Sequence, residues 1–299
     1  MKQQIKSSLI LLLTATIWGV AFVAQSVGME YIGPFTFNAI RCVLGGLVLI
    51  PVILVLKKKK ETGAENQEKE DKKTLWAGGI ACGVILCIAS NLQQFGIMEA
   101  SVGKSGFFTA LYIVMIPVIG IFIGKRPGIK LWFCVALAVV GMYLLCMKDG
   151  GFTIERADIM LLLCALVFSF HILVVDYFSP KVDGVKMSCI QFFVCGVLSA
   201  VGMLFTETPD ISNIQAAWLP LLYAGLLSCG VGYTLQIVGQ KGINPVIASL
   251  IMSLESVISA LAGWVILGQV LSPKEILGCV LMFVAIIITQ IPIGNKKTD

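Results

Sequence analysis

The chain has 299 residues, of which 58% are hydrophobic and 13% are charged, and its mean hydropathy is +0.93. Soluble domains are about 45–50% apolar and about 25% charged, so a soluble fold of this size could not bury so much apolar surface. The composition excludes an ordinary soluble protein and predicts a polytopic membrane protein. The net charge of +5 requires no nucleic-acid partner, because the basic residues gather on one side of the predicted membrane.

Ten apolar segments of 18 to 24 residues are each long enough for a helix to cross hydrocarbon. They cover residues 7–27, 35–56, 74–97, 103–123, 130–147, 157–177, 186–206, 216–238, 245–267 and 274–293. The alternation typical of a barrel is missing, so the sequence predicts an all-α fold of ten transmembrane helices. The first segment is too long for a signal peptide and is expected to remain as a helix. Residues 57–73, which are rich in Lys and Glu, are predicted to form a solvated cytoplasmic loop.

Basic residues predict the orientation of this bundle. If the N-terminus is cytoplasmic, 17 of the 22 Lys and Arg residues fall inside and four fall outside, and Arg41 lies within a segment. With an even number of crossings, both termini are expected in the cytoplasm. The predicted location is therefore the cytoplasmic (plasma) membrane, crossed several times, with lipid as a partner and without nucleic acid.

An internal repeat is visible at a spacing of 140 to 144 residues. Residues 109–112 occupy the same place in the fourth segment as residues 252–255 in the ninth. The predicted units are residues 1–150, which include the loop 57–73, and residues 151–299, with five helices each. Because five is odd, the two units must insert with opposite orientations. Inverted repeats are typical of secondary transporters, whose substrate site lies near the midplane where the halves meet.

The cysteines and the enzyme motifs provide little evidence for chemistry. All ten cysteines lie in apolar segments without a CxxC pair, so we interpret them as packing residues and expect no metal site or disulfide framework. No P-loop is present, and no cofactor or catalytic residue is predicted. The spacing from His171 to Asp176 matches the HxxxxD of some acyltransferases. On a continuous helix these side chains lie roughly 140° apart and would not converge on one atom.

Three stretches resemble the EamA family of the drug/metabolite transporter superfamily. The first segment contains WGVAFV at residues 18–23, GPFTFNAIR at 33–41 leads into the second, and the ninth contains SLE at 253–255. The resemblance covers nearly the whole chain and implies ten helices and export or facilitated movement of amino acids, metabolites or other small organic molecules. It also implies that the first, third, fourth, sixth, eighth and ninth helices line a central cavity.

The chain departs from the family pattern at three places. Many members end the fourth and ninth helices with Gly-Glu, whereas this chain has GK at 124–125 and GQ at 268–269. The ninth helix commonly contains Leu-Glu-Pro, but Ser256 follows Glu255 here, so a proline kink is not expected there. The fourth segment keeps Pro117.

Ionisable groups inside the bilayer are costly and mark candidate functional sites. Glu255 lies near the middle of the ninth segment and could contact a substrate ammonium, carry a proton or act as an interhelical strut. His171 could relay protons or contact substrate, or be a neutral histidine bonded to a neighbouring helix. Arg41 could attract a carboxylate, although a long side chain near a helix end can instead extend to the interface.

Neutral polar residues add a second group of candidates. Thr109 and Tyr112 share a helix face with Ser105, and Tyr233 shares one with Gln236. Trp18 could stack on substrate or simply pack. The remaining candidates are Asn91 and Gln94, which cluster with Gln93 in the third segment. Each could equally join helices to one another.

The sequence thus predicts a non-enzymatic secondary transporter that exports amino acids or similar small metabolites by alternating access. A passive facilitator or channel is the alternative, followed by an acyltransferase-like membrane enzyme. The fifth and tenth segments have almost no polar interior residues. They are expected at the periphery, as a candidate surface for a homodimer contact.

Overall fold

The computed structural model describes residues 2–62, 71–100, 102–124, 127–146, 155–267 and 271–291. Eight helical stretches in these ranges have the length and apolar composition needed to cross a membrane, and Ile129–Leu144 is a shorter apolar helix. The protein is therefore an all-helical, polytopic membrane protein. In chain order the helices are α1 (Lys2–Gly28), α2 (Pro34–Thr62), α3 (Lys72–Glu99), α4 (Val102–Ala110), α5 (Tyr112–Phe122), α6 (Ile129–Cys146), α7 (Arg156–Phe178), α8 (Gly184–Thr206), α9 (Ile211–Ala216), α10 (Trp218–Leu222), η1 (Tyr223–Tyr233), α11 (Thr234–Gln240), α12 (Pro245–Met252), α13 (Glu255–Leu267) and α14 (Pro273–Gln290).

Two predicted segments are interrupted near their middle. The fourth divides into α4 and α5 at Leu111, and the ninth divides into α12 and α13 at residues 253–254. The second break forms without a proline, and Pro117 lies within α5 instead of at the first. At both places the backbone makes i→i−3 hydrogen bonds, from Leu111 N–H to Phe108 and from Leu254 N–H to Ile251. Such tight turns interrupt an α-helix without a special residue.

The loop predicted after the second segment begins later than expected, because α2 continues to Thr62. Residues 63–70 lie outside the described residues, as do Lys125 and Gly268-Gln269 of the family comparison.

The eighth segment contains the π-helix η1 between α10 and α11. Trp76 of α3 matches Trp218 at a shift of 142 residues, whereas Gln93 matches Gln236 at a shift of 143. The second half therefore has one extra residue between these points. The wider turn of a π-helix accommodates it within a continuous helix, and such segments are frequent at functional sites.

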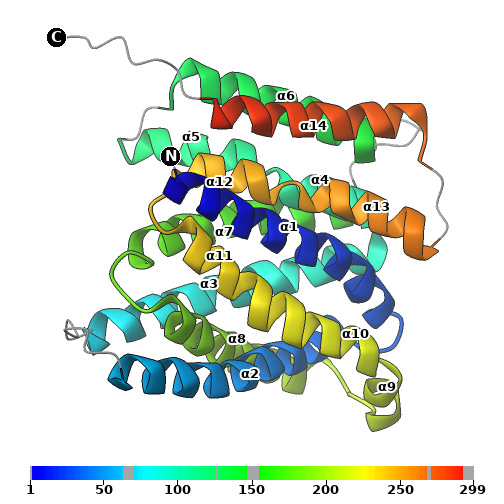
Figure 1. The fold of residues 1–299 in the computed structure, drawn as a ribbon. Coiled ribbons are helices and arrows are strands. Elements are labelled where there is room, and N and C mark those ends of the chain that lie inside the picture. The colour runs from blue at the N-terminus through cyan, green and yellow to red at the C-terminus, as the bar shows by residue number, and fades with distance from the viewer. Residues whose placement is uncertain are drawn as a thin grey trace.

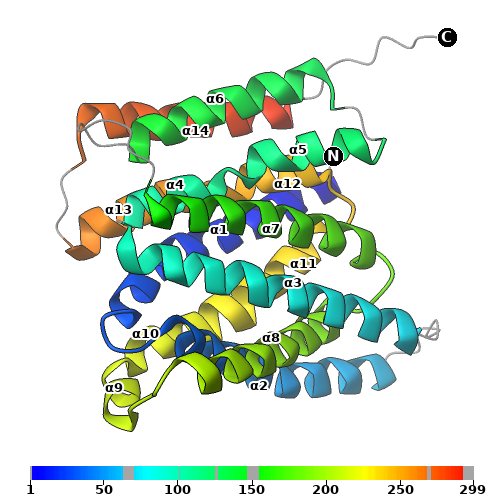
Figure 2. The same ribbon diagram turned by 180° about the vertical axis from the view of Figure 1, so that it is seen from behind.

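The two halves of the bundle are inverted relative to each other. Figures 1 and 2 show α1 and α7 running in opposite directions, with the start of α1 and the end of α14 at the same end of the bundle. Packing is also reciprocal: α1 lies against α13, α11 and η1, and α7 lies against α4, α5 and α3. α6 and α14 pack together at the periphery, where sequence placed the fifth and tenth segments.

The contact between α2 and α8 joins the two inverted halves. A Cβ on Gly46 would lie 3.0 Å from the Phe193 ring, and a Cβ on Gly196 would lie 3.1 Å from Cγ2 of Val43. Gly196 lies 150 residues after Gly46, and Phe193 lies 150 residues after Val43, so the two contacts correspond to each other in the repeat. The starts of α2 and α8 are also 150 residues apart. Glycine at these positions lets the two halves approach closely.

Glu207, which follows α8, caps the start of α2. Its carboxylate accepts hydrogen bonds from the N–H groups of Phe35 and Thr36, both at 2.9 Å, and from the Thr36 hydroxyl at 2.6 Å. The first N–H groups of a helix have no partner within the helix, and a carboxylate there also complements the helix dipole. This cap joins the two halves at the end of the bundle that carries α9 (Figure 1).

Candidate substrate cavity

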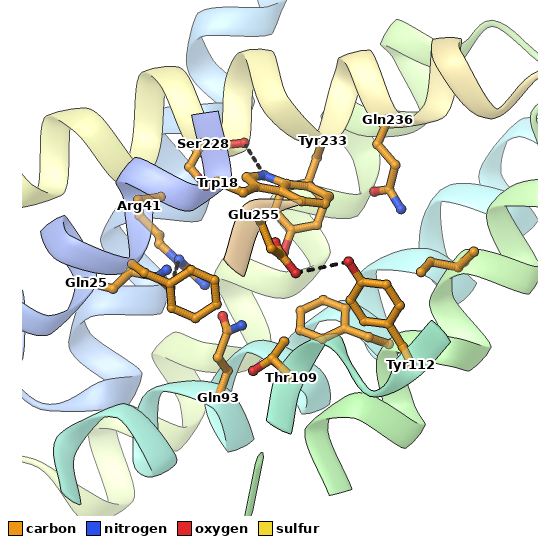
Figure 3. Close-up of a pocket in the computed structure, with 14 residues that line it drawn as sticks. Trp18, Gln25, Arg41, Gln93, Thr109, Tyr112, Ser228, Tyr233, Gln236 and Glu255 are labelled. Atoms are coloured by element: carbon orange, nitrogen blue, oxygen red, sulfur yellow. Dashed lines mark hydrogen bonds between the residues drawn. The ribbon is translucent and has the colours of Figure 1, made fainter. Parts of the chain in front are cut away.

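A narrow cavity lies in the middle of the bundle, lined by polar, aromatic and charged side chains. Every helix of the lining set implied by the family resemblance contributes, and α2 adds Arg41. The lining residues are Trp18, Ala21, Phe22, Gln25, Arg41, Gln93, Thr109, Tyr112, Phe168, Ile172, Ser228, Tyr233, Gln236 and Glu255 (Figure 3).

Glu255 and Tyr112 meet at the centre of the cavity. The Tyr112 hydroxyl donates to Oε1 of Glu255 at 3.0 Å, and the two residues are 143 positions apart. Each is the first residue of a helix that follows one of the two breaks, α5 or α13. They are therefore corresponding residues of the two repeats, and their hydrogen bond joins the halves on the axis that relates them. The N-terminal position also suits the Glu255 carboxylate, because the helix dipole favours negative charge there.

Arg41 supplies a positive charge to the same cavity. It is only 2% exposed, so its guanidinium lies in the cavity wall instead of extending to the surface. One of its nitrogens donates to Oε1 of Gln25 at 2.6 Å, and its Cζ lies 5.6 Å from the centre of the Phe37 ring. Neither Gln25 nor Phe37 carries a negative charge. Because a buried guanidinium without a counter-charge is costly, binding of an anion to Arg41 would be strongly favourable.

Aromatic rings form the wall around Glu255. The rings of Trp18 and Tyr233 lie 4.6 Å apart at 56°, and the Trp18 indole N–H donates to the carbonyl of Ser228 in η1 at 3.4 Å. Phe168, at the position of Trp18 in the second repeat, lies in the same cavity. Such faces can cover the apolar part of a substrate and attract a cation.

Three polar atoms of the lining residues are buried without a hydrogen-bond partner: Nε of Arg41, Oγ1 of Thr109 and Oε1 of Gln236. Buried polar atoms are nearly always paired in folded proteins, with protein or with water. These atoms are therefore the natural contacts for a polar ligand or for water in the cavity.

Of the residues predicted from sequence, Glu255, Arg41, Trp18, Thr109, Tyr112, Tyr233 and Gln236 line the cavity. Three predicted residues do not. Nε2 of His171 pairs with Oε1 of Gln191 at 3.2 Å, and the centres of the His171 and Tyr233 rings lie 6.1 Å apart in an edge-to-face arrangement. Gln94 is absent from the cavity lining, and its amide nitrogen donates to the Met29 sulfur at 3.5 Å.

Asn91 is the third, and it joins helices. It accepts from Asn38 at 2.9 Å and donates to Ser199 at 3.1 Å and to the Cys87 carbonyl at 2.7 Å. With these contacts made, few of its hydrogen-bonding atoms remain for a substrate. A functional role for Asn91, Gln94 and His171 stays a prediction.

Sequence reasoning missed several lining residues, chiefly Gln25, Gln93 and the backbone carbonyl of Ser228. Gln93 was seen only as part of a polar cluster, because the rotation of α3 about its axis cannot be read from an apolar segment with three adjacent polar residues. One signal could have selected it: Gln93 and Gln236 match one another in the two repeats, and both line the cavity.

The fold and the cavity define a helical membrane protein with a central polar cavity, and comparison with known proteins identifies its family. The EamA-like transporter family matches residues 5–147 and again residues 155–291, so the chain belongs to that family. Its two matches correspond to the two inverted halves.

Similar proteins carry the same general description. An uncharacterized transporter of Archaeoglobus fulgidus is 28% identical over 94% of this chain and 84% of its own length. The uncharacterized transporter YwfM of Bacillus subtilis is 24% identical over 97% of this chain and 96% of its own. A solved crystal structure aligns with a TM-score of 0.77 over 95% of this chain and 96% of that one, at 18% identity, which shows a shared fold alone.

Proposed function

We propose that this protein is a secondary transporter that exports amino acids or similar small zwitterionic metabolites across the cytoplasmic membrane by alternating access. The observation that carries the proposal is that a carboxyl group, Glu255, and a guanidinium group, Arg41, line one cavity between two inverted halves. Substrate sites of inverted-repeat transporters lie at this place.

The arrangement of charges supports a zwitterion. A substrate carboxylate would lie against Arg41 and Gln25, and an ammonium group would lie against Glu255 and the rings of Trp18 and Tyr233. Either charge alone would leave the other buried without a counter-charge, which is costly.

The orientation proposed from sequence is supported by where the described basic residues lie. Lys57, Lys72, Lys181, Lys186 and Lys241 are at the ends of helices on the side of the bundle where α1 begins (Figure 1). By the positive-inside rule this side faces the cytoplasm. Both termini are then cytoplasmic, and α9 faces outward.

The test is flux in proteoliposomes that contain the purified protein. Labelled amino acids are compared with matched analogues that lack one charge: the decarboxylated amine and the deaminated acid of the same side chain. The proposal expects flux of the zwitterion and at least about tenfold less flux of each analogue, because each leaves one buried charge unpaired. Equal flux of all three would contradict a zwitterion site.

A passive facilitator is the second candidate, because a single polar cavity in the middle of the bundle would also serve a solute that moves down its own gradient. The same vesicles separate the two: a carrier exchanges labelled substrate against unlabelled substrate on the other side and responds to an imposed proton gradient if coupled. A channel shows neither effect, and a passive carrier shows the exchange without a response to the proton gradient.

A further inference from the structure

Two small apolar clusters lie at opposite ends of the bundle, one on each side of the cavity. The N-side cluster is at the end where α1 begins and consists of Leu75, Cys82, Val175, Val182, Met187 and Ile237. The far-side cluster is at the end that carries α9 and consists of Ile32, Phe37, Ala217, Leu221 and Ala224. Figure 1 shows the starts of α3 and α8 at the first end and α9 with the start of α2 at the other.

The two clusters are counterparts in the inverted repeat. The shift of 150 residues that relates α2 to α8 places Ile32 on Val182. The same shift places Phe37 on Met187. Both pairs are buried, each residue being at most 7% exposed.

The contributions of α3 and of the segment around α10 follow the same rule. The shift of 142 residues that relates Trp76 to Trp218 places Leu75 on Ala217. It also places Cys82 on Ala224. Four of the five far-side residues thus have their repeat partner in the N-side cluster.

Three positions have no counterpart in the other cluster. One is Leu221 at the far side, where the N-side position is Gly79 at the shift of 142, so the N-side cluster has five large apolar side chains and the far-side cluster three. Val175 and Ile237 complete the N-side cluster, and both are 0% exposed. Their counterparts at the far side are polar: Gln25 at the shift of 150 and Gln94 at the shift of 143. Gln25 holds Arg41 in the cavity wall, and Oε1 of Gln94 is buried without a hydrogen-bond partner.

We infer that the two clusters are the paired gates of the transport path, and that they are unequal: the N-side gate is the stronger one and the far-side gate the weaker. This rests on the proposed function only in taking the central cavity as the part of the path that both gates enclose. The imbalance favours the conformation in which the N-side gate is shut and the cavity communicates with the far side.

The physical reason lies in what each gate gains when it closes. Closing the N-side gate removes two more large apolar side chains from water, and each such burial is favourable. Closing the far-side gate instead buries two amides, of which one finds no partner for its carbonyl oxygen. Opening that gate lets water reach this oxygen.

Cys82 makes the inference testable with a native reporter, because it lies inside the N-side gate and is 0% exposed. The experiment measures alkylation of the protein in liposomes by a water-soluble maleimide, resolved by peptide mass spectrometry. Val175→Gln gives the N-side gate the polar residue of its counterpart. It is expected to raise the rate of Cys82 alkylation at least about tenfold, because a buried valine contributes more than the equivalent of a tenfold change in population.

Cys134, on the peripheral helix α6, is the internal control, since it is also 0% exposed and lies away from both gates. General unfolding would raise the reactivity of both thiols together. The reciprocal variant is Gln94→Ile in an Ala224→Cys background, which gives the far-side gate an apolar residue. It is expected to lower alkylation at position 224.

Selective exposure of Cys82 in Val175→Gln, with protection of position 224 in Gln94→Ile, supports the inference. Unchanged Cys82, or equal rises at Cys82 and Cys134, overturns it. The measurement needs no substrate, so it is independent of the amino-acid assignment. If the gates respond but no amino acid is transported, the proposed substrate class fails alone; if amino acids are transported and Cys82 does not respond, the gates fail alone.

Discussion

The buried polar residues of this bundle divide by how many hydrogen-bond partners the protein itself provides. Asn91 has partners on α2, α3 and α8 and joins these helices. Thr109 and Gln236 line the cavity and each has a buried oxygen without a partner. In a membrane interior, satisfied polar groups hold helices together, whereas unsatisfied ones beside a cavity indicate a place for water or ligand.

Glu255→Gln tests the role of the central carboxylate. The amide keeps the size of the side chain and an acceptor for the Tyr112 hydroxyl, so the fold is expected to persist. Loss of the charge should lower flux of amine-bearing substrates at least about tenfold, since hydrogen bonds to charged groups contribute about 1.5–3 kcal/mol. The measurement is initial flux in proteoliposomes at equal protein content.

Tyr112→Phe is the complementary control, because it removes the hydrogen bond and keeps the carboxyl group, whereas Glu255→Gln removes the carboxyl group and keeps an acceptor. A smaller loss in Tyr112→Phe than in Glu255→Gln is expected. A loss of flux in Tyr112→Phe with normal flux in Glu255→Gln would mean that the hydrogen bond between the halves matters and the charge does not.

Asn91→Ala and Gln93→Ala should give opposite phenotypes, although the residues are two positions apart in α3. Asn91→Ala leaves the Asn38 amide nitrogen without its partner and removes one of the two partners of the Ser199 hydroxyl, so it should lower the free energy of unfolding by about 1–3 kcal/mol. Gln93→Ala should change substrate affinity with less effect on stability. Thermal unfolding in detergent and substrate-dependent flux measure the two. A Gln93 variant that only loses stability would remove Gln93 from the cavity function.

The sequence was sufficient to predict the charged and aromatic members of the cavity, because Glu255, Arg41 and Trp18 are conspicuous in an apolar chain. It was insufficient for Gln25 and for the choice of Gln93 over its neighbours. Those depend on helix rotation, which is fixed by packing against other helices and not by local propensity.

At the scale of the elements, the contact of α1 with the start of α13 positions Glu255. Gly19 permits it: a Cβ there would lie 2.5 Å from Cβ of Ile258 and 2.8 Å from the carbonyl oxygen of Glu255. The second of these atoms is backbone and cannot rotate away. The first turn of α13 therefore depends on a residue without a side chain in α1.

Gly19→Ala should displace the first turn of α13 and with it the Glu255 carboxylate. We expect a loss of about 1–3 kcal/mol of stability, as for other overpacked sites, and a reduced substrate affinity. The control is Gly128→Ala, since a Cβ at Gly128 meets nothing within 4 Å. Wild-type affinity and stability in Gly19→Ala would contradict this account of how α13 is placed.

Helix breaks and the π-helix are the elements that sequence did not predict. The breaks at Leu111 and at residues 253–254 lie among ordinary apolar and small residues, and the only proline nearby in the fourth segment is inside α5. Tertiary contacts across the repeat, such as the bond of Tyr112 to Glu255, accompany them. The insertion in η1 could have been found from the change in repeat spacing between Trp218 and Gln236.

For the whole molecule, the fold was largely predictable because the bilayer simplifies the problem. Long apolar segments must be helices in lipid, and two consecutive repeats with an odd number of membrane-crossing helices each must be inverted relative to each other. Packing then shows what hydropathy could not: which helices meet, that α2 and α8 meet through Gly46 and Gly196, and that the cavity lies on the axis. The unequal ends of the bundle also became visible only once Val175 and Gln25 could be compared in place.

The most direct test of the central claim asks whether substrate occupies this cavity. Thr109→Cys places a thiol in its wall, and alkylation of that thiol is followed by peptide mass spectrometry with and without the amino acid that shows the highest flux. The account predicts that the amino acid slows alkylation at position 109 in proportion to its occupancy and leaves alkylation of Cys134 unchanged. Full transport activity with no protection at position 109 would place the substrate elsewhere and contradict the account.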